Sequence, residues 1–353
     1  MVAPLRDRDA IVTPEGIIFR VYGYTHPPEG YVCDAEYAHA SIYMSNDPRA
    51  LRSGGGETYY KFYGDEGLRF VRDRFPKYTL FYEPLGVSLV GVRKRDFYMV
   101  LKPEDRFKRL MVIEAKDPLM KALKSIYHEV SRGAGLSLND FGVFGSILHG
   151  FYDPKCSDID LIVYGRAELA VLKNLLSEMY GRRGSLRNEF DDRKSVLGKK
   201  WKFRNYSLKE YLEHQRRKLV YAIYSDEESH REIKVEFEPV KRWCEIKNDY
   251  DSLSRIRKVG WAKCLARVTE DSDTAFMPSV YGVQIIKVFE GRGVEDVVRI
   301  NSYVEEFRMQ ANRDDLIYVE GNLEEVTGPK GGFHQITLTY CDRYYEQTLK
   351  VVS

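Results

Sequence analysis

Two acidic residues separated by one position are the part of this chain best suited to chemistry. Asp158 and Asp160 lead directly into the apolar residues 161–163. Because residues i and i+2 of a strand point to the same face, we expect the two carboxylates to lie side by side. Oxygen ligands are those that Mg²⁺ prefers, so this pair is suited to binding divalent metal ions. The apolar run indicates an interior strand, which argues against a solvated surface position.

A glycine–serine pair precedes these acids in the sequence. Gly145 and Ser146 follow the mainly apolar residues 141–144, and Gly150 comes shortly after them. Glycine lets a backbone approach a phosphate closely, and a hydroxyl with free amides at a helix start can bind one. Metal ions beside a phosphate site are the basic requirement of nucleotidyl transfer. We therefore expect Gly145 and Ser146 to bind the phosphates of a nucleotide.

The combined pattern resembles that of the DNA polymerase β-like nucleotidyltransferase superfamily, in which a Gly-Ser turn and a later glycine precede Asp-x-Asp on a hydrophobic strand. The similarity is strong over residues 140–165 and loose over 110–245. The superfamily includes CCA-adding enzymes, poly(A) polymerases, antibiotic nucleotidyltransferases and small AMP-transferring antitoxins. The resemblance implies an enzyme that transfers a nucleoside monophosphate from an NTP to a hydroxyl and releases pyrophosphate. It also implies two Mg²⁺ ions held between Asp158 and Asp160.

The resemblance further requires a third acid beside the pair. The segment 232–239 offers Glu236 and Glu238 on one face of a strand. In CCA-adding enzymes the third acid lies three residues before a proline, and Glu236 has this position relative to Pro239. We therefore expect Glu236 to complete the metal site and to accept the proton of the attacking hydroxyl, with Glu238 as the alternative. The family usually has aspartate here, and a solvated residue on an edge strand is the other interpretation.

A basic segment lies between the acid pair and the third acid. Its cations are Arg182, Arg183, Arg187, Arg193, Lys194, Lys199, Lys200, Lys202 and Arg204. The aromatic residues Trp201, Phe203 and Tyr206 alternate with the end of this run. Basic residues with aromatic neighbours suit phosphate backbones and stacked bases, so we expect Lys199 and Lys200 to bind the triphosphate, a nucleic-acid acceptor or both. A solvated loop with charged helix ends is the alternative interpretation.

The distribution of apolar residues predicts an α+β fold with three domains. Residues 1–110 consist mainly of β-branched and aromatic runs separated by turns, which predicts a β-rich N-terminal domain. Residues 111–247 alternate strands and helices in the order expected of the mixed sheet of a nucleotidyltransferase catalytic domain. Residues 248–353 alternate apolar and polar positions, which predicts a C-terminal β domain that resembles a small OB-like barrel.

Individual elements follow from the same patterns. The expected helices cover residues 66–75, 117–130, a short segment from 146, 167–180 and 208–224. The expected strands cover residues 17–24, 40–44, 78–82, 87–92, 97–101, 140–144, 158–164 and 232–238. In the C-terminal part, the expected β segments cover residues 262–269, 280–288, 296–309, 315–326, 334–340 and 346–352.

Composition is that of a globular intracellular protein. Of the 353 residues, 43% are hydrophobic and 31% are charged, with a formal net charge of +2. This net charge does not indicate a nucleic-acid-binding protein, so any basic surface must be local. Five scattered cysteines without a C-x-x-C pair argue against a structural zinc site and fit a reducing cytoplasm. No apolar run approaches the length of a membrane span, so we expect a cytoplasmic protein without a membrane partner.

The acceptor is the least determined part of the predicted function. An RNA acceptor is favoured because two flanking β domains are suited to holding a large partner. One alternative is a nucleic-acid-binding protein whose transferase domain has lost catalysis, which the glutamate at position 236 favours. Another is an AMP-transferring regulator that modifies a protein, although such proteins are usually much shorter. The sequence does not determine the base transferred, the number of units added or the oligomeric state.

Overall fold

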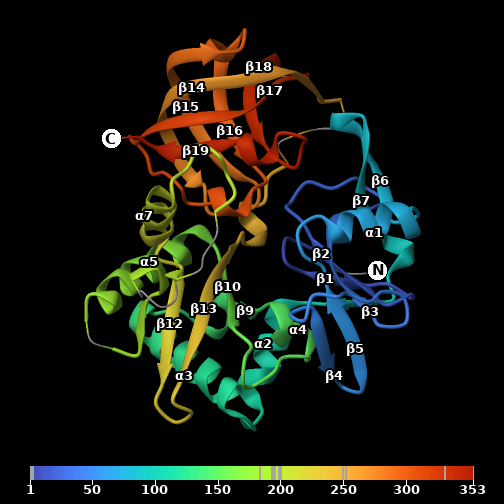
Figure 1. Cartoon of the computed structure of the whole chain (residues 1–353), viewed down its shortest axis with the longest axis vertical. Helices are drawn as coiled ribbons and strands as arrows, with labels where there is room; N and C mark the ends of the chain where they lie inside the picture. The colour runs from blue at the N-terminus through green and yellow to red at the C-terminus, as the bar shows by residue number, and fades with distance from the viewer. Residues whose placement is uncertain are drawn as a thin grey trace. The chain divides into compact units, whose positions relative to one another are not determined.

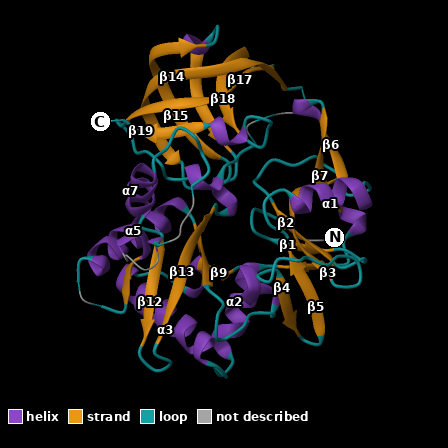
Figure 2. Cartoon of the chain, in the orientation of Figure 1, coloured by secondary structure: helices purple, strands orange, loops and turns teal. Residues whose placement is uncertain are grey.

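The computed structural model describes residues 4–182, 184–191, 196–197, 201–248, 250, 253–329 and 331–352. The chain divides into two compact units. The first contains Met1–Tyr82, Val87–Arg187 and Ala222–Lys247, and the second contains Glu83–Gly86, Asn188–Tyr221 and Asn248–Ser353. The described strands form three β-sheets. Figure 2 shows both the strands and the helices of the chain. The fold is therefore α+β, as predicted, whereas the three-domain division and the identity of the central sheet stay predictions.

A five-stranded mixed sheet in the first unit contains the candidate acids. Its strands are β9 (Phe141–Val143), β10 (Ile159–Tyr164), β11 (Leu186–Asn188), β12 (Tyr221–Asp226) and β13 (Arg231–Val240). The strand order is β11-β12-β13-β10-β9, with β10 parallel to β13 and antiparallel to β9. Residues 161–163 are fully buried, so β10 is an interior strand, as its apolar run predicted.

The first unit also contains helices, and the one over Pro118–Ala134 has favourable residues at both of its ends. The helices are α1 (Glu66–Arg74), α2 (Pro103–Val112), α3 (Pro118–Ala134), α4 (Gly145–His149) and α5 (Arg166–Tyr180). Before α3, the carboxylate of Asp117 accepts a hydrogen bond from the Met120 amide at 3.0 Å. Gly135 ends the same helix in the left-handed conformation, with φ of 66°. Among the described residues, no helix is long and apolar enough to cross a membrane.

The N-terminal part of the first unit forms an eight-stranded sheet. Its strands are β1 (Ala10–Val12), β2 (Ile17–Val21), β3 (Gly30–His39), β4 (Leu51–Gly54), β5 (Glu57–Lys61), β6 (Thr79–Tyr82), β7 (Val87–Arg93) and β8 (Met99–Leu101). Ala10, Ile18 and Tyr37 of this sheet belong to the same apolar cluster as Ile162 and Val240 of the five-stranded sheet. The two sheets of the first unit therefore share a core.

Two element predictions are wrong. Residues 40–44 lie outside any strand, whereas Gly30–His39 form the long strand β3 that the pattern did not predict. Because β3 pairs with β2, β5 and β7, this pairing outweighs the local β propensity. The helix predicted over 208–224 is α7 (Leu208–Lys218), which ends because Leu219 takes a left-handed φ of 65°. The residues after it form β12 instead.

The second unit contains a curled sheet of six strands, visible at the C-terminal end of the colour range in Figure 1. The strands are β14 (Arg255–Asp273), β15 (Ser279–Glu290), β16 (Val297–Ser302), β17 (Leu316–Gly328), β18 (Gly331–Leu338) and β19 (Thr348–Val351). Their order is β14-β15-β16-β18-β17-β19, and β14 also pairs with β17, so the path of pairings returns to its start. The inward residues of β14 include Ala262, Cys264 and Ala266, whose small size allows strongly curved strands to pack around one core.

A buried polar segment, residues 5–9, connects the two sheets of the first unit. Arg6 donates hydrogen bonds to the Lys241 carbonyl at 3.2 Å and to Glu104 at 3.1 Å. The side chain of Asp9 accepts a hydrogen bond from the Arg6 amide at 3.0 Å and is 1% exposed. Burial, with a further contribution from Glu104, raises the pKa of Asp9 to about 7. This carboxyl group therefore opposes folding when it is ionised.

The raised pKa of Asp9 predicts that the protein loses stability as the pH rises. Folded Asp9 keeps its proton up to about pH 7, whereas the unfolded chain releases it at about pH 4. The folded state binds more protons in this window, so the free energy of unfolding falls as the pH increases through it. Asp9→Asn should flatten this decrease by on the order of a few kcal/mol, measured by chemical denaturation across the window. The exposed Asp73→Asn is the control, and equal slopes for both variants would contradict the prediction.

Candidate functional site

The register between β10 and β13 places three of the candidate acids on one face of the five-stranded sheet. Asp160 lies directly opposite Glu236 in the parallel pairing. Because residues two apart along a strand share a face, Glu238 belongs to this face as well, and Asp158 directly precedes β10, two residues before Asp160. Asp158 is exposed, Asp160 and Glu236 are half-buried, and Glu238 is buried. The predicted pair and both candidates for the third acid therefore lie together.

Gly145 lies directly against the carboxylate of Asp160. A Cβ atom added to Gly145 would be 2.3 Å from Asp160 Oδ2. The φ of Gly145 is 59°, in the left-handed region that favours glycine. The Phe144 amide donates a hydrogen bond to the Asp160 carbonyl at 3.0 Å, and the half-buried Ser146 follows in α4. The two halves of the sequence motif are thus in contact in the fold.

This contact predicts that Gly145→Ala displaces the Asp160 carboxylate. The left-handed φ costs alanine roughly 1 kcal/mol, and the added methyl group overlaps Oδ2. The sequence motif predicts Mg²⁺-dependent NTP binding, and we expect a folded variant in which this binding, measured by equilibrium dialysis, is weaker by about tenfold or more. Gly135→Ala is the matched control, because Gly135 has φ of 66° and its Cβ would meet no heavy atom within 4 Å. Equal NTP binding by the two variants would contradict the prediction.

Glu238 is bound by a buried arginine from the N-terminal segment. Arg8 Nη2 donates to Glu238 Oε2 at 2.8 Å, and the Arg8 side chain is fully buried. Arg8 Nη1 lies 3.6 Å from Asp7, and the backbone of Arg8 has a left-handed φ of 73°. Glu238 is thus paired with Arg8 and buried, whereas Glu236 is half-buried. The choice of Glu236 as the third acid stays a prediction.

Like charges surround Asp160. Burial first, then Glu238 and Asp158, raise the pKa of Asp160 to about 7, while Lys61 acts in the opposite direction. Carboxylates that repel one another in this way are stabilised by a bound cation, and such perturbed groups are frequent at functional sites. The electrostatics of this face therefore favour a cationic ligand.

A complete metal-ligand set is not assembled on this face. Among the residues that the structure describes, no group of three or more His, Cys, Asp or Glu side chains is arranged to hold a metal ion. Glu238 is turned to Arg8, and Asp158 is exposed.

Residues of the N-terminal sheet form the opposite side of the acidic face. Tyr37 packs in one cluster with Ile162, which follows Asp160 on the same face of β10. Arg20 lies 3.1 Å from Asp34 and is therefore already paired. Arg8 and Lys61 come from the same part of the chain, and their charges act on the acids. The site is thus built from both sheets of the first unit.

His149, at the end of α4, belongs to an aromatic cluster. Its ring stacks on Phe151 at a centroid distance of 5.1 Å and contacts Tyr37 edge-on at 5.3 Å. Neither ring nitrogen has a hydrogen-bond partner among the described residues. Burial, and to a lesser extent Arg106, lowers the pKa of His149 to about 3. The ring is therefore neutral near pH 7 and unsuited to proton transfer there.

The predicted phosphate ligands Lys199 and Lys200 lie outside the described residues. Arg204, a described cation of the same basic segment, pairs with Glu346 at 3.1 Å. Lys202 lies over the ring of Tyr345, with its ammonium 5.7 Å from the centroid. These two cations are therefore engaged with side chains of the second unit, and a phosphate-binding role for the segment stays a prediction.

The aromatic residues of the basic segment pack inside the second unit. Phe203 and Tyr206 are 4% and 8% exposed and belong to the core of the curled sheet, where both contact Phe307. The ring of Trp201 stacks on Tyr211 at 4.2 Å. The alternation of basic and aromatic residues therefore reflects a core-forming segment, and Phe203 and Tyr206 are not available to stack on bases.

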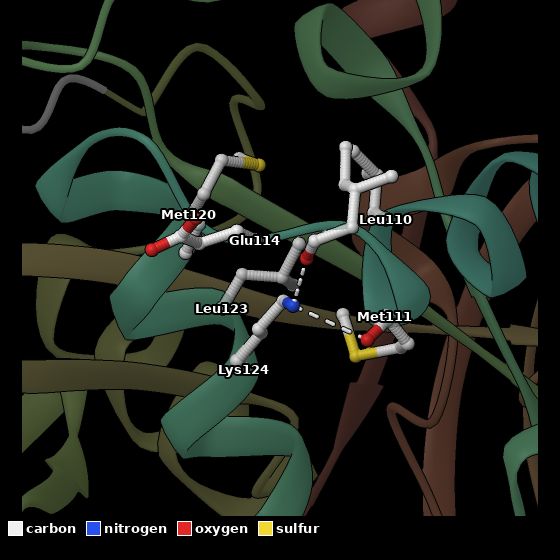
Figure 3. A pocket seen from close by; sticks show the side chains of 8 residues that line it. Leu110, Met111, Glu114, Met120, Leu123 and Lys124 are labelled. Carbon is white, nitrogen blue, oxygen red and sulfur yellow. Dashed lines mark hydrogen bonds between the residues drawn. The ribbon is translucent and has the colours of Figure 1, made fainter.

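A small hollow beside α2 and α3 is separate from the acidic face (Figure 3). It is lined by Leu110, Met111, Ile113, Glu114, Ala115, Met120, Leu123 and Lys124. The ammonium group of Lys124 donates to the Met111 carbonyl at 3.2 Å and also to the Ile113 carbonyl. None of the candidate acids lines this hollow, and its charged amine is already satisfied, so we assign no function to it.

Comparisons with known proteins do not identify a family. No family model matches the chain. The chain is 24% identical over 330 residues to the uncharacterized protein MJ1086 of Methanocaldococcus jannaschii, and the alignment covers 93% of each chain. No solved structure matches. The similarity therefore extends along almost the whole chain but carries no functional description.

Arg8 and Lys61 are the site residues that the motif analysis did not find. Arg8 contacts a glutamate 230 positions away in the sequence, and no local pattern predicts so distant a pair. The alternating charges of residues 6–9, directly before the apolar start of β1, are the signal that could have singled out Arg8. Charged groups next to a buried strand need partners, because burying an unpaired charge costs several kcal/mol.

Proposed function

We propose that the chain is a Mg²⁺-dependent nucleotidyltransferase that moves a nucleoside monophosphate from an NTP to a hydroxyl group of RNA. The observation that carries this proposal is the contact between Gly145 and Asp160, which joins the Gly-Ser turn to the acid strand. A Cβ atom at position 145 would lie 2.3 Å from Asp160 Oδ2, so only glycine fits there without displacing the carboxylate. A motif assembled in this way supports a shared function for its two halves.

The donor set on the acidic face fits Mg²⁺ in chemical type. Asp158, Asp160 and Glu236 offer carboxylate oxygens, which are the ligands that Mg²⁺ prefers, and their mutual repulsion favours a cation. These three residues would hold the two metal ions. When bound, the ions would neutralise charge on the triphosphate and lower the pKa of the attacking hydroxyl.

The other residues of the motif have roles that follow from their positions. Gly145 leaves room for the nucleotide's phosphates beside Asp160, and the Ser146 hydroxyl would donate to a phosphate oxygen. Glu236, half-buried and opposite Asp160, would accept the proton of the attacking hydroxyl. Glu238 would act indirectly, since its pairing with Arg8 keeps it from rotating into the site.

The second unit offers support for a nucleic-acid acceptor. Its curled sheet, with the parallel β16–β18 pair, resembles the OB-like barrel that the sequence predicts, and such barrels often bind oligonucleotides. On β15, Phe289 is 50% exposed, and its ring lies 6.1 Å from that of Tyr318. The ammonium group of Lys287 lies 5.1 Å from the same Phe289 ring. An exposed aromatic ring with a neighbouring cation suits a stacked base and a phosphate backbone.

A second candidate function is nucleic-acid binding without catalysis. The observation that favours it is that the described acids are not arranged as a complete metal site. The glutamate at position 236, where the superfamily usually has aspartate, points in the same direction. On this alternative, the second unit would bind RNA, and the acidic face would be a remnant of a catalytic site.

The experiment that tests the proposal is incubation with each labelled NTP, Mg²⁺ and total RNA. The Asp158→Ala/Asp160→Ala double variant is run in parallel as the control. Label that enters RNA only with the unsubstituted protein would establish transfer and identify both the nucleotide and the acceptor class. Bound NTP without labelled RNA would exclude an RNA acceptor and direct the search to proteins or small molecules. Absence of both labelling and NTP binding would contradict the proposal and support the binding protein.

A further inference from the structure

The β4–β5 hairpin of the N-terminal sheet packs against the turn that follows the Gly-Ser motif. A Cβ atom added to Gly54 would lie 2.4 Å from the Gly150 carbonyl oxygen and 2.7 Å from Phe151 Cα. The ring of Tyr59 on β5 lies 5.5 Å from that of Phe151. Backbone contact of this kind leaves little freedom, so the hairpin holds a defined position beside α4.

This hairpin presents Lys61 on the side of the acidic face. Lys61 ends β5 and pairs directly with Tyr37 of β3. Directly opposed residues of antiparallel strands have side chains on the same face. Tyr37 points into the cluster that contains His149 and Phe151, with centroid distances of 5.3 and 5.0 Å. Lys61 therefore shares the face of the N-terminal sheet that meets the Gly-Ser turn and Asp160.

The charge of Lys61 is not neutralised by an ion pair. Its ammonium group has no hydrogen bond and no salt bridge with any residue that the structure describes, and it lies 6.0 and 5.9 Å from the ring centroids of Tyr37 and Tyr63. Lys61 is half-buried and acts electrostatically on both Asp160 and Glu36. By contrast, the arginines at positions 8 and 20 on the same side are paired with carboxylates. Lys61 thus lies next to the candidate catalytic acids, and its ammonium group can still bind an anion.

We propose that Lys61 binds the triphosphate of the incoming NTP, so that the N-terminal sheet forms part of the nucleotide site. This inference rests on the proposed nucleotidyltransferase function. A lysine ammonium is a compact point charge on a flexible stem and pairs well with phosphate oxygens. On this proposal, the acids would hold the metal ions that bind the phosphates, and Lys61 would add a positive charge of the protein itself. The β and γ phosphates, which the monophosphate lacks, are the groups that Lys61 recognises.

The test compares the binding of ATP and AMP, in Mg²⁺, to the full-length protein and its Lys61→Met variant. We expect Lys61→Met to weaken ATP binding by about 10- to 100-fold and to change AMP binding by less than about twofold. Lys61→Arg, which keeps the charge, should recover most of the ATP affinity. Lys94→Met is the matched control, because Lys94 lies in the same sheet region, is exposed and donates to the Pro28 carbonyl. It should bind both nucleotides normally.

The outcomes separate this inference from the proposed function. In one outcome, the unsubstituted protein and Lys61→Met bind ATP equally well, whereas the Asp158→Ala/Asp160→Ala variant does not bind it. This outcome would exclude the role of Lys61 and leave the proposed function in place. If the unsubstituted protein binds no NTP, both proposals are overturned. An equal loss of ATP and AMP binding in Lys61→Met would assign Lys61 to packing and overturn the inference. Lys61→Gln, which keeps a polar side chain, provides the same comparison should the methionine variant fold poorly.

Discussion

Asp160→Ala is expected to lower nucleotide transfer by roughly a thousandfold or more without unfolding the protein. Asp160 lies at the centre of the acidic face, opposite Glu236 and against Gly145. On the proposed function, its removal would take away one of the carboxylates that would hold the Mg²⁺ ions, and each tenfold loss of rate corresponds to about 1.4 kcal/mol of lost stabilisation. The same substitution removes a carboxyl group whose pKa is raised to about 7. Near neutral pH, the variant should therefore be as stable as the unsubstituted protein or more so.

The measurement combines labelled-NTP transfer with thermal unfolding of the same samples. Asp105→Ala, at an exposed position on α2, is the control and should keep full activity. The third acid is identified in the same assay, because Glu236→Gln should reduce transfer nearly as much as Asp160→Ala. Glu238→Gln should reduce it less, since Glu238 already bonds to Arg8. Full transfer by Asp160→Ala would refute the assignment of the site.

Arg8→Met is expected to destabilise the first unit by about 3–5 kcal/mol, the largest effect on stability that the structure predicts. Arg8 is fully buried between Glu238, at 2.8 Å, and Asp7, at 3.6 Å. Without the guanidinium, the buried Glu238 carboxylate loses its ion pair at 2.8 Å, and Asp7 loses a positive charge at 3.6 Å. Arg8 also has a left-handed φ of 73°, a backbone conformation that costs free energy for a residue other than glycine. Urea denaturation and hydrogen exchange of the peptides around residues 5–12 and 231–240 measure the effect.

A second substitution separates charge from packing in this prediction. Arg8→Met/Glu238→Gln should recover part of the lost stability, because the neutral amide no longer needs a countercharge. Arg69→Met is the control, since Arg69 forms an exposed pair with Asp65 at 2.9 Å and should change stability by less than about 1 kcal/mol. If Arg8→Met unfolds at the same urea concentration as Arg69→Met, the structural role of the buried pair is refuted.

Most local structure around the candidate site could be predicted from the sequence. The apolar run 161–163 predicted the interior strand β10, and the helical spacing of apolar residues over 117–130 predicted α3. In these segments, side-chain periodicity and capping act over a few residues, which are contained in the local sequence. Strand β3 and the end of α7 were predicted wrongly, because pairing with three strands and the backbone of Leu219 outweigh local propensity.

The sequence by itself determined the α+β composition and identified the acids and the Gly-Ser turn as the candidate site. Only the tertiary structure decided that Glu236 lies opposite Asp160 and that Arg8 forms an ion pair with Glu238. It also decided that Lys61, which has no ion-pair partner among the described residues, lies on the face of the N-terminal sheet that meets the acids. The physical reason is the range of the interactions. Periodicity and glycine conformation act between neighbours in the chain, whereas strand register and buried ion pairs join residues separated by up to 230 positions. These long-range interactions contribute to stability only after the chain has folded and the two sheets of the first unit pack around one core.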